Sequence, residues 1–276
     1  MTASLNRRVV WALLALAAGC ASEAQKAPAT SNAPAPMAAR AAATPTSANY
    51  FSAGQLDSTA LIEPPPVAGS DAARADLQAV LDAQRAAHAS ATTARAVGDT
   101  VIDCQRVADV LVTKEPSPVA SGDGAAGVAF ATRAAKQVSA AASAPKRHWA
   151  RPRPYIVSAG VERLGDVAPG SPLAITGGYE RDHTSYPSGH TTFGTACAIV
   201  LAQMVPEQSA ALFARARLYG ESRLIVGAHF PTDVDAGRRV GTAASGVMLQ
   251  NAQFQADLRA ARAQLRGALG LPPIAP

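Results

Sequence analysis

Residues 185–204 read SYPSGHTTFGTACAIVLAQM, and their character changes sharply at His190. The first part contains a proline, two serines and a glycine, which are typical of a turn. From 191 to 204, small and apolar residues follow helical spacing and predict a helix. Ser188 and Gly189 therefore stand immediately before a helix that we expect to begin near His190.

Helical patterns recur on both sides of this stretch. Asp71 is typical of an N-cap and opens a predicted helix that continues to about His88. Further helical patterns span 92–112, 125–142, 207–228, 232–251 and 252–269. The segment 145–187 is instead rich in glycine, proline and charge, and predicts mostly long loops. A loop of this length inside a compact domain usually serves a function.

The composition favours an all-α fold. Of the 276 residues 48% are apolar and 5% aromatic, and alanine is the dominant apolar type. Small side chains suit closely packed helices, whereas a β-sandwich needs more alternation of Val, Ile, Tyr and Thr. We therefore expect one all-α domain, a bundle of roughly seven helices. The net charge of +5 is spread along the chain without a basic stripe, which disfavours nucleic acid as a partner.

The N-terminus has the pattern of an export signal over residues 1–20. Arg7 and Arg8 precede an apolar run, 9–19, that is too short to span a bilayer. The run ends in Ala-Ala-Gly-Cys, which resembles the lipobox of bacterial lipoproteins and would make Cys20 the lipidation site, although Ala17 stands where leucine is usual. Cleavage by the ordinary signal peptidase, for example after Ala24, is the alternative. Both outcomes predict a periplasmic protein, and lipidation would tether it to the outer membrane.

Residues 21–50 are rich in Ala, Pro, Ser and Thr, a composition that predicts a disordered linker ahead of a domain at 51–276. No later apolar run reaches the ~20 residues of a membrane-spanning helix. Apart from Cys20, the chain has Cys104 and Cys197. Export permits a disulfide between them, but their apolar, helix-like surroundings fit two buried free thiols equally well.

Three separated groups of residues carry the chemistry. They are Lys146 with Arg153-Pro154 after six residues; Pro187-Ser188-Gly189-His190; and Ser222-Arg223 with His229 after five residues and Asp233 after three more. This order and spacing resembles the signature of the PAP2 (type 2 phosphatidic acid phosphatase) superfamily. The stretches SYPSGHT at 185–191, GESR at 220–223 and DVDA at 233–236 make the chain most similar to its class A bacterial nonspecific acid phosphatases.

The resemblance covers about 61–269. It implies the all-α fold that this family shares with the vanadium haloperoxidases, and self-association into a homo-oligomer. One residue departs from the class A pattern: Thr184 stands where glycine is usual, which predicts an altered loop beside the substrate. His183 lies in the same loop and remains a further candidate.

Spacing resolves two ambiguities in the signature. Counting back from Arg151 places Ala144 where the lysine should stand, whereas counting back from Arg153 gives Lys146. Arg153 is therefore the candidate, and Arg151 is interpreted as a neighbouring surface or second-sphere charge. The gap of three residues after His229 likewise selects Asp233 over the nearby Asp235.

These residue types suit phosphate chemistry. A phosphomonoester spreads nearly two negative charges over its oxygens during transfer, so positioning and charge stabilisation supply most of the catalysis. Arg153 and Arg223 have planar guanidinium groups that can bind two oxygens each, and Lys146 has a compact ammonium charge that can bind a further oxygen. Ser188 and Gly189 precede a helix whose first amides can bind an anion, and Gly189 lets the backbone approach closely.

The two signature histidines have separate expected roles. His229 is the predicted nucleophile, with Asp233 accepting from its other ring nitrogen and fixing the tautomer. Because Pro231 lies between them, we expect His229 to close one helix and Asp233 to enter the first turn of the next. His190 is the predicted general acid for the leaving group and then the base for water. With a pKa near its ordinary value of about 6.5, it predicts an acidic optimum.

The sequence thus predicts a metal-independent acid phosphatase acting on small phosphomonoesters. No Asp, His or Cys cluster has metal-ligand spacing, so no metal or other cofactor is expected, and vanadate should bind as a phosphate mimic. Vanadium haloperoxidases are the main alternative, but they are typically much larger and resemble this chain only around the signature. A membrane lipid phosphatase would need spanning helices. A phosphate-binding or scaffold protein would not need the complete catalytic set found here.

Overall fold

The computed structural model describes residues 48–112, 115, 117–164 and 184–274, and these contain helices but no β-strand. This confirms the predicted all-α fold. The export signal, Cys20, most of the linker and His183 lie outside the described residues. The α-helices are α1 (Asp71–Ser90), α2 (Thr93–Gly98), α3 (Gln105–Ala108), α4 (Gly122–Ser139), α5 (Ser143–Trp149), α6 (Pro154–Val157), α8 (Gly189–Met204), α9 (Ser209–Ile225), α10 (Pro231–Leu249) and α11 (Ala252–Ala268).

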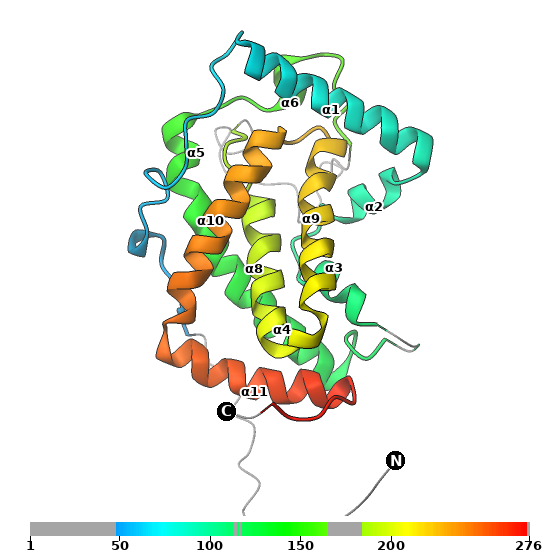
Figure 1. Cartoon of the computed structure of the whole chain (residues 1–276), viewed down its shortest axis with the longest axis vertical. Helices are drawn as coiled ribbons and strands as arrows, with labels where there is room; N and C mark the ends of the chain where they lie inside the picture. Colours follow the sequence, from blue (N-terminus) through cyan, green and yellow to red (C-terminus); the bar gives the residue numbers. More distant parts are fainter. Residues whose placement is uncertain (1–47, 113–114, 116, 165–183, 275–276) are drawn as a thin grey trace, which may run out of the picture. The chain divides into compact units, whose positions relative to one another are not determined.

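Helix α8 is the central element of the bundle and contacts α4, α9, α10 and α11 (Figure 1). Its sequence is apolar or small on every side, which is typical of a helix enclosed by others. Phe193, Leu201 and Met204 are among its fully buried side chains. The start of α8 lies against α10 so closely that a Cβ on Gly237 would come 2.5 Å from the Ser188 carbonyl oxygen. Glycine at 237 therefore lets the turn before α8 rest on α10.

The packed part of the chain includes the last residue of the predicted linker, Tyr50. This side chain is 1% exposed and lies between Phe130 of α4 and Phe254 of α11. Its hydroxyl donates to Asp257 at 2.7 Å. Tyr50 thus joins α4 to α11. The division of the whole chain into signal, linker and domain stays a prediction.

Two predicted segments differ from the structure. The pattern over 92–112 is divided into α2, α3 and the short 3₁₀ helix η2 (Asp109–Leu111). The division follows Asp99, whose buried carboxylate pairs with Arg215 and accepts from Ser222 of α9, so the chain is held away from a continuous helix. Part of the predicted loop 145–187 is helical, because α5 reaches Trp149 and α6 follows at 154–157.

A disulfide joins Cys104, the N-cap of α3, to Cys197 in α8, with Cα atoms 5.4 Å apart. This decides between the two alternatives that the sequence left open. The bond closes a long loop, since 93 positions separate the two cysteines. Such a cross-link stabilises a fold chiefly by restricting the unfolded chain. Among the ranges described above, no helix combines the length and apolarity needed to cross a membrane.

Replacing both cysteines, Cys104→Ala with Cys197→Ala, should lower the free energy of unfolding by about 4 kcal/mol, the size expected for a loop of this length. Urea denaturation monitored by circular dichroism measures the change. Reductant should destabilise the wild-type protein and leave the double variant unaffected. An unchanged midpoint for fully reduced wild-type protein would contradict this expectation.

Candidate active site

The structure brings the three signature groups together at one end of α8. Lys146 lies on α5, Arg153 caps α6, and Arg223 lies in the last turn of α9. Ser188, Gly189 and His190 form the start of α8, while His229 and Asp233 flank the start of α10. The residues are close enough to act on one another electrostatically: the pKa of His229 is lowered by burial and also by Arg153, Lys146 and Arg223. Every residue of the predicted site therefore lies at this one place.

His229 is held as a neutral imidazole with a defined tautomer. Its side chain is 2% exposed, with Nδ1 3.3 Å from Oδ2 of Asp233 and Nε2 3.2 Å from Nη1 of Arg153. Because a guanidinium only donates hydrogen bonds, Nε2 must be the acceptor, and the proton resides on Nδ1 facing the carboxylate. Burial first and the three neighbouring cations second hold the pKa of His229 well below its ordinary value. Nε2 thus carries no proton, and its lone pair accepts from Arg153.

The turn between α9 and α10 positions this histidine. Gly227 has φ +72°, and a Cβ there would come 2.3 Å from the carbonyl oxygen of Glu162. The amide of His229 then donates to the carbonyl of Arg223 at 3.2 Å. Pro231 begins α10, and Asp233 in its first turn accepts from the Phe230 amide at 2.8 Å. The structure places Asp233 in the first turn as predicted, while His229 lies in the turn after α9.

His190 is oriented by a group that carried no sequence signal. Its Nε2 lies 2.9 Å from the backbone carbonyl of Thr100, which can only accept, so Nε2 bears the proton and Nδ1 bears the lone pair. The ring stacks on Tyr219 of α9, with centroids 6.0 Å apart. A backbone carbonyl is present at every position, so its role here could only come from the tertiary structure.

The pKa of His190 differs from the expectation of a near-ordinary value. Burial lowers it well below that value, and Arg223, Arg153 and Lys146 lower it further against the opposing carbonyl of Thr100. Without a bound anion, the imidazole of His190 is therefore neutral to a lower pH than an ordinary histidine would be. An anion bound among the cations would favour the protonated form.

Arg223 is the clearest sign that an anion belongs here. Its side chain is buried, with 7% of the residue exposed, yet Nε and Nη1 have no hydrogen-bond partner within the described ranges. Burial lowers its pKa to about 10, with Arg153 as the next cause. Unpaired buried donors are costly and rare in folded proteins. A guanidinium in this state is suited to receive the oxygens of an anion in a bidentate manner.

Lys146 and the start of α8 complete the anion site. The ammonium donates to the carbonyls of Thr184 at 3.0 Å and Ser185 at 3.2 Å. Burial lowers the pKa of Lys146 to about 7, and Arg153 contributes further. Thr184 makes this contact through its backbone carbonyl, so having threonine in place of the usual glycine does not remove the contact.

Ser188 was predicted to bind phosphate, but its hydroxyl and its amide both form hydrogen bonds within the protein. Its hydroxyl accepts from the amide of Thr191 at 3.2 Å, and its own amide donates to the carbonyl of Asp233 at 2.9 Å. The amides of Gly189 and His190, at the start of α8, have no acceptor one turn earlier in the helix. These two N–H groups, rather than that of Ser188, are therefore placed to bind an anion.

Other candidates lie apart from this site. Asp235 is largely exposed and pairs with Arg238, which agrees with the choice of Asp233. His88 is exposed and pairs with Glu162, and His148 is exposed beside Trp149. Arg151, however, is buried and bonded to Asp233, so a surface position for it was the wrong alternative.

The comparisons with known proteins agree with this arrangement. Residues 124–256, which include every signature residue, match the family described as PAP2 superfamily. This match covers just under half of the chain and shows that the segment is similar to the PAP2 superfamily. Similar curated proteins are a non-specific acid phosphatase of Salmonella typhimurium, 44% identical over 85 residues, and one of Providencia stuartii, 42% identical over 78 residues. An acid phosphatase of Zymomonas mobilis is 38% identical over 84 residues.

Each of these alignments covers a limited part of both proteins. The matched segment is 28% to 31% of this chain and 32% to 34% of the relative. The chain thus spans about a third of the length of the curated relatives that it matches. The alignments show similarity over this segment, and the activity of the whole protein has to be argued from the site.

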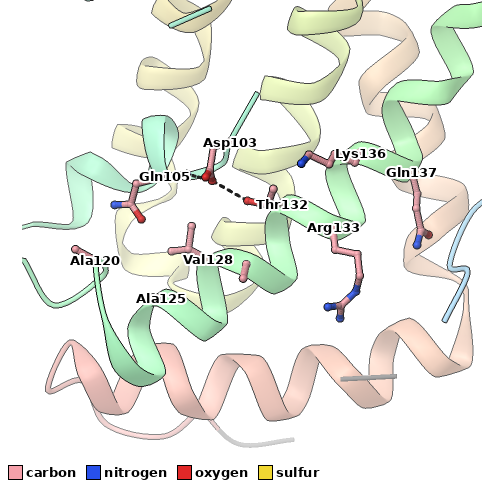
Figure 2. A pocket seen from close by; sticks show the side chains of 10 residues that line it. Asp103, Gln105, Ala120, Ala125, Val128, Thr132, Arg133, Lys136 and Gln137 are labelled. Atoms are coloured by element: carbon pink, nitrogen blue, oxygen red, sulfur yellow. Dashed lines mark hydrogen bonds between the residues drawn. The ribbon is translucent and has the colours of Figure 1, made fainter. Parts of the chain in front are cut away.

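A pocket of about 760 Å³ lies apart from this site, along α4 (Figure 2). Asp103 and Gln105 line it on one side, and Thr132, Arg133 and Lys136 of α4 also face it. None of its lining residues belongs to the signature. Within the described segments, no group of three or more His, Cys, Asp or Glu side chains could hold a metal ion.

The lowered pKa of Lys146 predicts a pH-dependent affinity for phosphate. Above about pH 7 the unliganded lysine loses its proton and its charge. Binding of inorganic phosphate, measured by isothermal titration calorimetry, should weaken between pH 6 and 8.5 by about tenfold relative to Lys146→Arg, which stays charged. The ionisation of phosphate affects both proteins equally, so it cancels in the ratio of their affinities. Parallel pH dependences would contradict this assignment.

Proposed function

We propose that this protein is an acid phosphatase of the class A nonspecific type, which hydrolyses phosphomonoesters through a phosphohistidine at His229. One observation carries the proposal: Nε2 of His229 accepts from Arg153 within a cluster of three cations, of which Arg223 is buried and Lys146 and Arg153 are partly buried. Among these cations, Arg223 has two unpaired N–H groups. The names of the similar proteins, acid phosphatase and non-specific acid phosphatase, support the same activity.

In the first step, Nε2 of His229 forms a bond to phosphorus as the bond to the leaving oxygen breaks. His190, protonated in the complex, gives its proton to that oxygen, so the alcohol leaves neutral. The phosphorylated imidazole keeps its proton on Nδ1 and carries a positive charge, which the carboxylate of Asp233 stabilises. Lys146, Arg153 and Arg223 balance the charge on the equatorial oxygens.

In the second step, water replaces the histidine. His190 is now neutral and accepts a proton from water, whose oxygen bonds to phosphorus. The N–P bond breaks, and its electron pair returns to Nε2, which restores the neutral imidazole. Inorganic phosphate leaves, and His190 is protonated for the next cycle.

Three cationic side chains supply in this scheme the positive charge that metal ions supply in other phosphoryl-transfer sites. The proposed reaction therefore needs no metal. All contacts that we assign are to the phosphoryl group, which favours a broad range of leaving groups. An alcohol in place of water would give phosphotransfer as a side activity.

The acidic optimum follows from the sign of the histidine shift. Because burial and nearby cations lower the pKa of His190, the free enzyme needs an acidic solution to hold the proton for the first step. Bound phosphate opposes the cations and raises the pKa of His190 again. Activity should therefore be highest below neutral pH.

The test is hydrolysis of p-nitrophenyl phosphate across pH in the presence of EDTA. We expect EDTA-resistant activity that is highest below pH 7, inhibited by vanadate, and reduced about a thousandfold or more in His229→Ala. His88→Ala is the matched control, since that exposed histidine lies outside the site. Activity that requires an added divalent metal, or survives in His229→Ala, would overturn the mechanism.

Two further measurements, of bromide oxidation and of phosphate binding, separate the proposal from its alternatives. Oxidation of bromide with vanadate and peroxide, without ester hydrolysis, would identify a haloperoxidase. Tight phosphate binding without turnover would identify a binding protein. Export to the periplasm, lipidation of Cys20 and self-association remain predictions that we add to the proposal. Mass spectrometry of the mature N-terminus and light scattering would test them.

A further inference from the structure

A buried row of charged groups leads from α1 to the candidate nucleophile. Asp76 of α1 lies 2.8 Å from Nη2 of Arg151, and Nη1 of Arg151 lies 2.8 Å from Oδ1 of Asp233. The other oxygen of Asp233 faces Nδ1 of His229. Carboxylate, guanidinium, carboxylate and imidazole thus follow one another without intervening solvent.

Arg151 is fixed in this row from several sides. Its guanidinium stacks on Phe230 at 3.9 Å from the ring centroid, and Nη1 also donates to the hydroxyl of Thr232 at 2.7 Å. The residue is 8% exposed, and both terminal nitrogens are engaged. Arg151 is therefore not arranged as a ligand for phosphate, in contrast to Arg223 with its unpaired donors.

We propose that Arg151, anchored by Asp76, is a positioning residue that keeps Asp233 ionised and turned toward Nδ1 of His229. The inference rests on the proposed function for its effect on the reaction, whereas the effect on the histidine tautomer does not. Without Arg151, the carboxylate would be held at Oδ2 by the imidazole and the Phe230 amide, and it could take up a proton at Oδ1 or rotate away. The rigid guanidinium fork opposes both changes.

The charge on Asp233 matters most after phosphoryl transfer, when the imidazole is positive. Burial raises the pKa of Asp233, and Arg151 is the largest opposing influence, followed by the Phe230 amide and Lys146. The charged and titratable groups around this carboxylate are therefore Arg151, His229, Lys146 and Tyr186, with Asp76 behind Arg151. Loss of the guanidinium charge should let Asp233 take up a proton at a higher pH.

The decisive variant is Arg151→Gln in an Asp76→Asn background, so that Asp76 is not left as an unpaired buried charge. We expect kcat for p-nitrophenyl phosphate to fall by about ten- to a hundredfold, with KM within about threefold of wild type. The acid limb of the kcat profile should move to higher pH. Arg151→Lys, which retains the charge, should bring the limb back toward the wild-type position.

A structural role alone predicts a different result. Arg266 is also buried and pairs with Glu207, away from the site, so Arg266→Lys is the control for general destabilisation. It should lower the melting temperature without moving the acid limb. If the Arg151→Gln protein does not fold, Asp76→Asn alone is the test, because it removes the ion pair at Nη2 of Arg151. This variant should lower kcat by a smaller factor.

A second readout is independent of activity. Imidazole nitrogen NMR of the wild-type protein, with the His229 signals assigned by His229→Gln, should show the proton on Nδ1. The Arg151→Gln variant should show a mixture of tautomers. An unchanged tautomer together with an unchanged acid limb would overturn the inference. Wild-type protein without phosphatase activity would instead overturn the proposed function, and the NMR result would still decide the role of Arg151.

Discussion

Asp233 is fully buried, and each of its oxygen atoms binds a different part of the chain. One carboxylate oxygen accepts from Arg151, and the other accepts from His229 and from the Phe230 amide. Its backbone carbonyl accepts from the amide of Ser188. The first turn of α10 thereby holds the start of α8, the turn after α9 and the segment before α6 in one place. Asp233 therefore links parts of the site that come from elements far apart in the sequence.

The site brings positively charged side chains close enough to lower one another's pKa. Lys146 and Arg223 both have pKa values lowered first by burial, and Asp233 is the carboxylate that raises that of Lys146. Such an arrangement lowers the stability of the unliganded protein. The oxygens of a bound anion would relieve both the repulsion and the unpaired donors of Arg223. The stability of the rest of the bundle compensates for this cost.

The loop that carries Thr100 shows how the surrounding fold supports His190. Before this residue, Asp99 is held by Arg215 and Ser222 of α9. After it, the carbonyl of Val101 accepts from the hydroxyl of Tyr219 at 2.8 Å, and Cys104 is bonded to α8. Contacts on both sides therefore fix the single carbonyl that orients His190. The same contacts explain why 92–112 does not form one helix, since a straight helix would move Thr100 away from the site.

The amino-acid sequence by itself predicted the all-α fold, which the structure confirms, and a set of candidate site residues, which the structure brings together. Helical spacing depends on neighbours within a few residues, and the signature depends on fixed spacings along the chain, so both can be followed without coordinates. The tertiary structure decided what spacing cannot encode. It paired Cys104 with Cys197 and joined the Ser188 amide to the carbonyl of Asp233. It also lowered the pKa of His190 and placed Arg151 between the buried carboxylates of Asp76 and Asp233. Each of these depends on burial and on contacts between distant residues, and these arise only when α8 is enclosed by its neighbours.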